Sequence, residues 1–368
     1  MKRTGSWAVL AVLLAAGCFT APKEVNVNVN TGDRTSTGTG SAAAPGGGSW
    51  TDLLYGAGGQ MLAAEHGAVY YAFDTLAYPG QPVDLAVRLQ SAKDLKGVEG
   101  AKIFFYQGDK LVGQAKTDAS GLAKMSWTPP KAGTYPLEAR VAEVPKEEWK
   151  EMTQCTPAPL LVAAWDKNDP MVVIDLDHTL VDSSFFRVLV GGARPMADSR
   201  VVTERLARQY RLVYLTHRPD LLTRKSKTWL SDNGYPPGPL LVSELKQAFG
   251  DSGAFKTARL RDLRKAYPNV KAGIGDKYSD AQAYVDNDLT AVLIPYYKAK
   301  PKDMREAATE IGRLNGRGKL HVVDSWQQIE QSILQGRKFP PESYVKDLQK
   351  RARQLEEEQR ARDKEDDD

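Results

Sequence analysis

A chain of 368 residues, of which 42% are hydrophobic and 26% charged, has the ordinary composition of a globular protein and enough length for two hydrophobic cores. Its formal net charge of +4 is small for this length, and no cluster of basic and aromatic residues is present, so a nucleic-acid partner is not indicated. The two cysteines, Cys18 and Cys155, are too few to form a disulfide framework.

Residues 1–18 have the pattern of a signal peptide. Two basic residues near the start precede the apolar stretch 7–16, which is too short to span a bilayer as a permanent anchor. The segment that ends at Cys18 resembles a bacterial lipoprotein signal, with an ordinary secretory signal and a buried helix as the alternatives. The resemblance implies that Cys18 carries a lipid anchor in the bacterial cell envelope. Phe19, and not Asp, follows the cysteine, which favours the outer membrane, facing the periplasm.

Residues 19–49 are mostly Asn, Thr, Ser, Gly and Ala and are expected to form a flexible linker, because they offer almost no apolar side chain for a core. Residues 50–163 then show a period of two, for example at 83–89, and a hairpin-like connection at 107–110. Several short strands separated by turn signals predict an all-β sandwich. The T-D-x-x-G motif at 117–121, followed by W-T-P and G-T-Y, resembles bacterial immunoglobulin-like domains. Such a domain binds a ligand or the cell wall, or serves as a spacer, and we favour the spacer.

Residues 164–335 change to an alternation of strands and helices. Short apolar runs typical of buried parallel strands occur at 171–174, 211–215, 270–274, 291–294 and 320–323. Apolar residues at helical spacing predict helices at 199–210 and 223–233. This alternation predicts an α/β domain with a doubly wound, Rossmann-like sheet, whose site lies at the carboxyl ends of the strands.

Residues 336–368 are strongly charged and end in three aspartates. Their apolar residues have coiled-coil-like spacing over only about two heptads, which is fewer than a sustained coiled coil requires. These residues are Val345, Leu348, Ala352 and Leu355. We therefore expect the tail to be a solvated helix or a disordered segment.

Two carboxylates directly follow the strand expected at 171–174. Asp175 and Asp177 lie two residues apart on an extended chain, so they share one face. Carboxylates at close range repel each other unless a cation lies with them, and a hard divalent ion such as Mg²⁺ relieves that repulsion. The D-x-D-x-T pattern that ends at Thr179 has moderate specificity, because the same residues can also cap a turn after a strand.

Three further polar segments follow this pair in chain order. Thr216 ends the second expected strand and can bind a phosphoryl oxygen through its hydroxyl. Lys256 precedes a helical stretch and can neutralise a nucleophile and a phosphoryl group. Asp276 and Asp280 follow the third expected strand, where a metal ion would need them. The four segments in this order resemble the haloacid-dehalogenase-like phosphohydrolases over residues 169–295.

The resemblance implies a role for each of these residues. Asp175 would attack phosphorus and form an aspartyl-phosphate, while Asp177 would protonate the leaving oxygen and then activate water. Thr216 and Lys256 would hold the phosphoryl group. The implied ligands of Mg²⁺ are Asp175, the backbone carbonyl of Asp177, Asp276 and Asp280. Phosphatases and mutases of this superfamily share the second acid, and its dehalogenases lack it, so phosphoryl chemistry is implied.

Within the superfamily, residues 214–243 look like the catalytic domain of lipins and of the actin-patch type of phosphatidate phosphatase. A Phe-Lys pair at 255–256 and a glycine-led acidic loop at 275–284 follow in much the same order. His178 stands where lipins commonly have Gly. Both families remove phosphate from phosphatidic acid, so phosphatidate is a candidate substrate. The segments between the motifs are short and leave no room for a large cap domain.

The sequence leaves open the roles of Arg218 and His178 and a second function for the whole protein. Arg218, with His217 before it, can contact a substrate phosphate or headgroup, or Arg218 can pair with a nearby acid. His178 is expected to point away from the catalytic pair, and we favour packing or support of a site residue over a catalytic role. The rival to the phosphatase is a non-catalytic cell-envelope lipoprotein in which the immunoglobulin-like domain binds or supports. The complete set of catalytic residues favours the enzyme.

Overall fold

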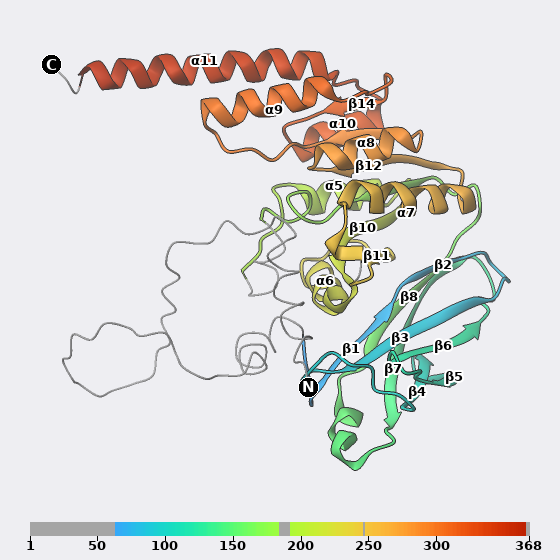
Figure 1. The fold of residues 1–368 in the computed structure, drawn as a ribbon. Helices are drawn as coiled ribbons and strands as arrows, with labels where there is room; N and C mark the ends of the chain where they lie inside the picture. Colours follow the sequence, from blue (N-terminus) through green and yellow to red (C-terminus); the bar gives the residue numbers. More distant parts are fainter. Residues whose placement is uncertain (1–62, 184–191, 246, 366–368) are drawn as a thin grey trace, which may run out of the picture.

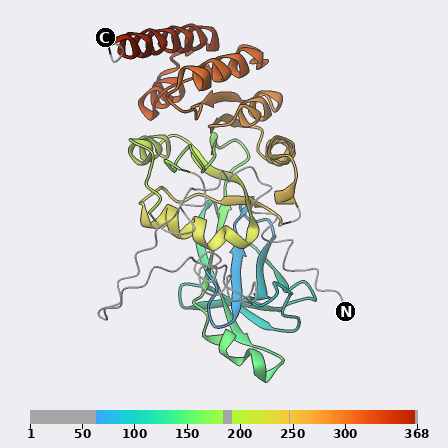
Figure 2. The same cartoon turned by 60° about the vertical axis from the view of Figure 1, so that its left-hand side comes forward.

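The computed structural model describes residues 63–183, 192–245 and 247–365. The expected signal peptide, its Cys18 and the linker 19–49 lie outside these residues. Within them the chain forms an N-terminal β-rich domain, drawn in blue to green in Figure 1, and a C-terminal α/β domain. The turned view in Figure 2 shows the same separation into two parts.

The N-terminal domain consists of two β-sheets packed against each other. The first sheet has the strand order β1 (Ala68–Phe73), β3 (Val83–Ser91) and β6 (Leu122–Trp127). The second has the order β2 (Thr75–Ala77), β8 (Ala158–Ala164), β7 (Gly133–Glu143), β4 (Lys102–Gln107) and β5 (Lys110–Lys116). A short helix, η1 (Glu147–Gln154), precedes β8. The prediction of a sandwich from period-two segments is confirmed at this level.

Alternation along the strands explains how the two sheets share one core. Leu85, Val87 and Leu89 on β3 are fully buried, and so are Ile103 and Phe105 on β4 of the other sheet. The residues between them are more exposed, as expected when successive side chains point to opposite faces. Strands β4 and β5 form the hairpin that the sequence predicts at 107–110.

The C-terminal domain is built on a six-stranded parallel sheet. Its order is β11 (Leu240–Ser243), β10 (Arg211–Pro219), β9 (Met171–Ile174), β12 (Val270–Gly275), β13 (Thr290–Leu293) and β14 (Leu320–Val322). The five strands predicted from apolar runs are present, and β11 is an additional one. The chain runs outward from β9 to β11, then crosses to β12 and runs outward to β14. The carboxyl ends of β9 and β12 therefore border the point where the order reverses, where open α/β sheets bind ligands.

Helices cover both faces of this sheet. They are α5 (Ser199–Leu206), η2 (Asp220–Leu222), α6 (Thr223–Asp232), η3 (Gln247–Phe249), α7 (Ser252–Ala266), α8 (Tyr278–Asp286), α9 (Pro301–Arg313), α10 (Trp326–Gln335) and α11 (Pro341–Glu365). Val173 on β9 packs in the core with α7, α8, α9 and α11, whereas Val172 and Ile174 pack with α5, α6 and α10. Among the described residues, no helix combines the length and the apolarity that crossing a membrane requires.

Helix α11 differs from the solvated helix expected for the tail. Its first part packs along α9, and Tyr344, Leu348 and Ala352 are buried there. The apolar residues with coiled-coil-like spacing therefore pack against α9 of the same chain. The later residues of α11 extend beyond α9, as Figure 1 shows in red. The first part of α11 is buried because α9 presents an apolar stripe of its own, which includes Met304 and Ile311.

Gly273 in β12 allows α8 to lie close to the sheet. A Cβ atom at this position would lie 2.2 Å from the ring of Tyr284 on α8. We expect Gly273→Ala to lower the free energy of unfolding by about 1–3 kcal/mol, the usual cost of overpacking a core. The matched control is Gly312→Ala near the end of α9, where a Cβ atom would meet nothing within 4 Å. There, alanine is expected to be neutral or to stabilise by up to about 1 kcal/mol. Urea unfolding of both variants measures the difference, and equal stabilities would contradict the tight packing.

Candidate active site

Three adjacent strands bring polar side chains to one edge of the sheet. Asp175 directly follows β9, Thr216 lies in the last part of β10, and Asp276 directly follows β12. The backbone N–H of Asp175 donates to the carbonyl of Ile274 at 2.9 Å, which continues the pairing of β9 with β12 up to the site. Because β9 lies between β10 and β12, parallel pairing alone places these three residues next to one another.

Lys256 reaches the same edge from α7. Asp251 caps this helix, since its side chain accepts the backbone N–H of Ala254 at 2.6 Å. The Nζ atom of Lys256 donates to Oδ1 of Asp175 at 2.7 Å and to Oδ2 of Asp280 at 2.6 Å. Burial by itself would lower the pKa of Lys256, but the two carboxylates outweigh it and hold the pKa well above its ordinary value. Lys256 is therefore a permanently charged bridge inside the site.

Asp175, Asp276 and Asp280 form a buried cluster of carboxylates. One oxygen from each lies within 4.8 Å of the others, and all three residues are buried. Burial raises the pKa of Asp175 to about 6, helped by the charges of Asp280 and Asp177 and opposed by Lys256. Burial and the charges of Asp175 and Asp280 raise the pKa of Asp276 well above its ordinary value. The cluster thus carries more negative charge than its surroundings neutralise.

The donor atoms of this cluster fit a hard divalent cation. Oδ1 of Asp276 and Oδ1 of Asp280 are buried, and neither has a hydrogen-bond partner among the described residues. Buried oxygen atoms without a partner are costly, and coordination of a cation would satisfy them. Oxygen ligands of this kind are those that Mg²⁺ and Ca²⁺ prefer. The cluster can therefore hold a metal ion.

Asp177 is bound by Arg218. The guanidinium donates from Nη2 to Oδ1 of Asp177 at 2.6 Å and from Nε to Oδ2 at 3.0 Å, which is a bidentate pair. Its third contact is a bond from Nη1 to Oγ of Ser226 on α6, at 2.9 Å. Of the two roles that the sequence leaves open for Arg218, the structure contains the ion pair with an acid.

Thr216 and His217 lie next to Arg218 in the chain but contact different groups. Thr216 is buried, and its hydroxyl accepts the backbone N–H of Arg218 at 3.3 Å. Nε2 of His217 lies 3.0 Å from the carbonyl oxygen of Gln247, and its ring centroid lies 5.1 Å from that of Phe255. Burial lowers the pKa of His217. A neutral ring that donates from Nε2 to this carbonyl accounts for the contact, so His217 borders the site without touching its carboxylates.

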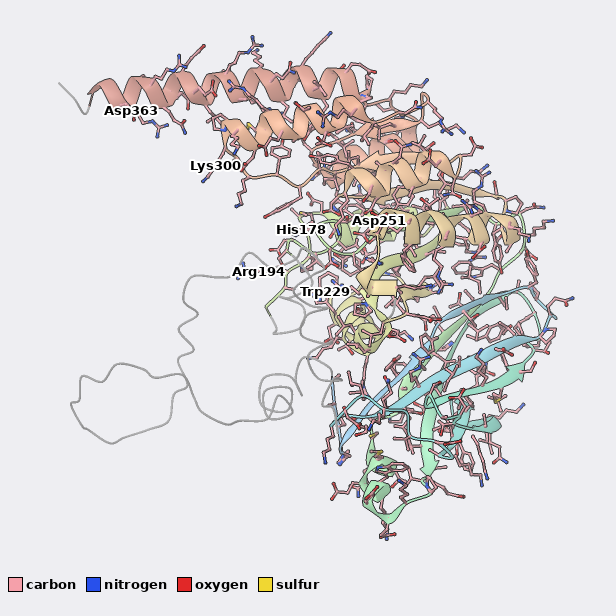
Figure 3. The ribbon with its side chains drawn as sticks, viewed as in Figure 1. His178, Arg194, Trp229, Asp251, Lys300 and Asp363 are labelled. Carbon is pink, nitrogen blue, oxygen red and sulfur yellow. The ribbon has the colours of Figure 1, made fainter. Side chains whose placement is uncertain are left out.

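His178 adopts a left-handed backbone conformation, with φ at 52°. Glycine reaches this conformation without strain, whereas His is one of the few other residues that enter it readily. The Gly that lipins commonly have at this position suits the same turn. The ring of His178 stacks on Tyr296, with 4.0 Å between the ring centroids. Figure 3 shows His178 at the side of the molecule where Arg194 and Lys300 also lie.

Three residues that sequence reasoning did not select also border the site. Ser226 holds Arg218, and Tyr296, which is 56% exposed, covers His178. Lys277 directly follows Asp276. Desolvation would lower the pKa of Lys277, but nearby carboxylates, Asp175 first among them, raise it. Only the position of Lys277 in the acidic loop could have marked it, whereas nothing local in the sequence marks Ser226 or Tyr296.

Comparison with known families finds one match in this domain. Residues 172–294 match the family described as PITM 1-3, LNS2 domain, which covers less than half of the chain. The match supports a haloacid-dehalogenase-like phosphatase, and hence a hydrolase, for the part of the chain that carries the site. No curated protein matches the chain.

Several solved structures are similar to parts of the chain. The D0-D1 domain of intimin is 24% identical over 26% of this chain and 46% of its own, with a TM-score of 0.20. The Pnkp1/Rnl/Hen1 RNA repair complex is 13% identical over 42% of this chain and 57% of its own, with a TM-score of 0.32. The chain thus spans about half the length of these two structures. Both TM-scores are low.

Proposed function

We propose that this protein is a Mg²⁺-dependent phosphomonoester hydrolase that works through an aspartyl-phosphate on Asp175. The observation that supports the proposal most is the position of Asp175. Its carboxylate accepts a hydrogen bond from a buried lysine, lies in a cluster of acids suited to a divalent ion, and is two residues from a second, differently held acid. Acids held in different environments within one site are typical of acid–base catalysis.

The proposed reaction divides the work among the protein's own side chains. Oδ1 of Asp175 is held by Lys256, so Oδ2 is the atom assigned to attack phosphorus. As the P–O ester bond breaks, Asp177 releases one of its two bonds from Arg218 and passes to the leaving oxygen a proton that it has taken up from solvent. Asp177 then takes a proton from water as the water attacks phosphorus, and the bond from phosphorus to Oδ2 of Asp175 breaks. Phosphate leaves, Asp177 returns its proton to solvent and pairs with Arg218 again, and both carboxyl groups are in their starting forms.

Lys256 and Thr216 are assigned to the phosphoryl oxygens. Lys256 is buried and charged, and its ammonium lies within hydrogen-bond distance of the nucleophile, where negative charge passes from Asp175 to the phosphoryl group. Preorganised charge of this kind lowers the barrier more inside a protein than in water. Asp175, Asp276 and Asp280 would hold Mg²⁺, which when bound neutralises these carboxylates and the phosphoryl charge.

Phosphatidate is the substrate that we propose to test first. The match to the LNS2 domain supports it, and lipid attachment at Cys18 in the cell envelope, which we also propose, would place the site close to lipid phosphates. The exposed ring of Tyr296 beside His178 leaves an aromatic surface at the edge of the site.

An activity panel on the chain purified without residues 1–18 tests the proposal. We expect Mg²⁺-dependent release of phosphate from p-nitrophenyl phosphate and from phosphatidate in detergent micelles, loss of both activities in a chelator, and recovery when Mg²⁺ is restored. Turnover of the soluble ester without turnover of phosphatidate would remove only the lipid substrate. No turnover of any phosphomonoester would reject the enzyme in favour of an envelope binding protein.

A further inference from the structure

The segment that follows β10 contacts the β-sandwich. This segment consists of η2 and α6, and α6 lies against β1 of the sandwich, as Figures 1 and 2 show from two directions. Three ion pairs connect it to the sandwich. They are Asp220–Arg88 at 2.7 Å, Arg224–Glu65 at 3.3 Å and Lys227–Asp74 at 2.6 Å. A segment of the α/β domain that begins beside a site residue is therefore held by the other domain.

The Asp220–Arg88 pair lies largely out of contact with solvent. The side chain of Asp220 is 1% exposed and that of Arg88 is 20% exposed. Beside this pair, Leu221 and Leu222 of η2 pack with Tyr71 of β1 in one apolar cluster. Removal of one member of such a pair leaves an unpaired buried charge, which the structure can relieve only by moving toward solvent. The position of η2 thus depends on Arg88 of the sandwich.

The same segment holds Arg218, which in turn holds Asp177. Ser226 accepts the bond from Nη1 of Arg218 and lies on α6 between Arg224 and Lys227, the two residues of α6 that pair with the sandwich. The rest of the guanidinium is bound to Asp177. Because the Arg218 side chain is only 3% exposed, its orientation is set by these protein contacts.

We propose that the β-sandwich is part of the catalytic unit and that Arg88 is a positioning residue for Asp177, acting through Asp220, α6 and Arg218. This inference rests on the proposed phosphatase function, in which Asp177 protonates the leaving oxygen. A proton donor acts only within hydrogen-bond reach of that oxygen, so a small displacement of Asp177 reduces its contribution. The contribution of a general acid also depends on the leaving group, because an acidic phenol can leave without a proton and an alcohol cannot.

Arg88→Met in the full purified chain tests the proposal with two soluble esters, p-nitrophenyl phosphate and ethyl phosphate. The measured quantity is kcat/KM, because it reports the steps up to formation of the aspartyl-phosphate. We expect kcat/KM to fall by about 10-fold or more on ethyl phosphate and to change little on p-nitrophenyl phosphate. The fall is smaller than the complete loss of a general acid would cause. Asp177→Asn should show the same selective loss to a larger degree, and Arg88→Lys, which keeps the charge, should recover most of the activity on ethyl phosphate.

Lys102→Met is the matched control, because Lys102 pairs with Glu143 of the same domain at 3.0 Å. This variant should leave the activity on both esters unchanged. Equal losses on the two esters in Arg88→Met, or no loss on either, would overturn the positioning role. Hydrogen–deuterium exchange of the 175–182 backbone gives a readout without activity, and we expect faster exchange in Arg88→Met than in Lys102→Met. If the wild type hydrolyses neither ester while Arg88→Met still exchanges faster than Lys102→Met, the proposed function is refuted and the link to the sandwich is supported. Equal exchange in the two variants would refute that link.

Discussion

Replacing Asp175 with Asn is expected to lower kcat for p-nitrophenyl phosphate by about 10⁴-fold or more, as loss of a catalytic residue does in other hydrolases. The amide is a poor nucleophile toward phosphorus, and no other described carboxylate has the same position at the end of β9. The amide has nearly the same shape as the carboxyl group and removes one negative charge from a crowded cluster. The variant should therefore fold, and thermal unfolding should show a midpoint equal to or above that of the wild type.

Asp182→Asn is the matched control for this variant. Asp182 lies seven residues further along the same loop, is exposed, and accepts the backbone N–H of Arg194 at 3.3 Å, a bond that the amide oxygen of Asn can also accept. We expect its kcat to stay close to that of the wild type. If Asp175→Asn turned over the ester at the rate of this control, Asp175 would not be the nucleophile.

Lys256→Met is expected to remove most activity and also to destabilise the metal-free protein by about 3–5 kcal/mol, the usual cost of removing one partner from a buried ion pair. Lys256 is 2% exposed and bridges two carboxylates that are themselves buried. Without its charge, Asp175 and Asp280 face each other with no compensating cation. Urea unfolding in the presence of a chelator measures this loss.

Lys265→Met on the exposed side of the same helix is the control for the lysine variant, and its stability should change by less than about 0.5 kcal/mol. Mg²⁺ should return part of the stability lost in Lys256→Met, because an ion bound by the same carboxylates replaces the missing positive charge. Equal stability of the two variants in a chelator would mean that Lys256 does not compensate the buried acids.

Much of the sheet and of its site could be predicted from local patterns. Apolar runs marked β9, β10 and β12, and parallel strands end at one edge, so Asp175, Thr216 and Asp276 were expected to meet there. The structure brings these three together. The sequence does not mark strand β11, because its four residues follow a proline-rich turn and are too few to show a period.

The residues from helices and from the other domain were harder to place. The sequence marks Lys256 by its place before a helical stretch, and the resemblance to a superfamily implies its role, but its two carboxylate partners are seen only in the structure. The apolar spacing in the last helix was visible in the sequence, but its partner was not, because α9 becomes its neighbour only when the sheet is complete.

The sequence by itself therefore determined the two domains, the parallel sheet and the order of acids around Asp175, since these depend on period, run length and chain order. Only the tertiary structure decided what Arg218 contacts. Its partner Asp177 lies 41 residues earlier in the chain, and its support on α6 depends on ion pairs with the sandwich. Contacts between residues so far apart form when domains pack together, and no local pattern in the chain encodes them.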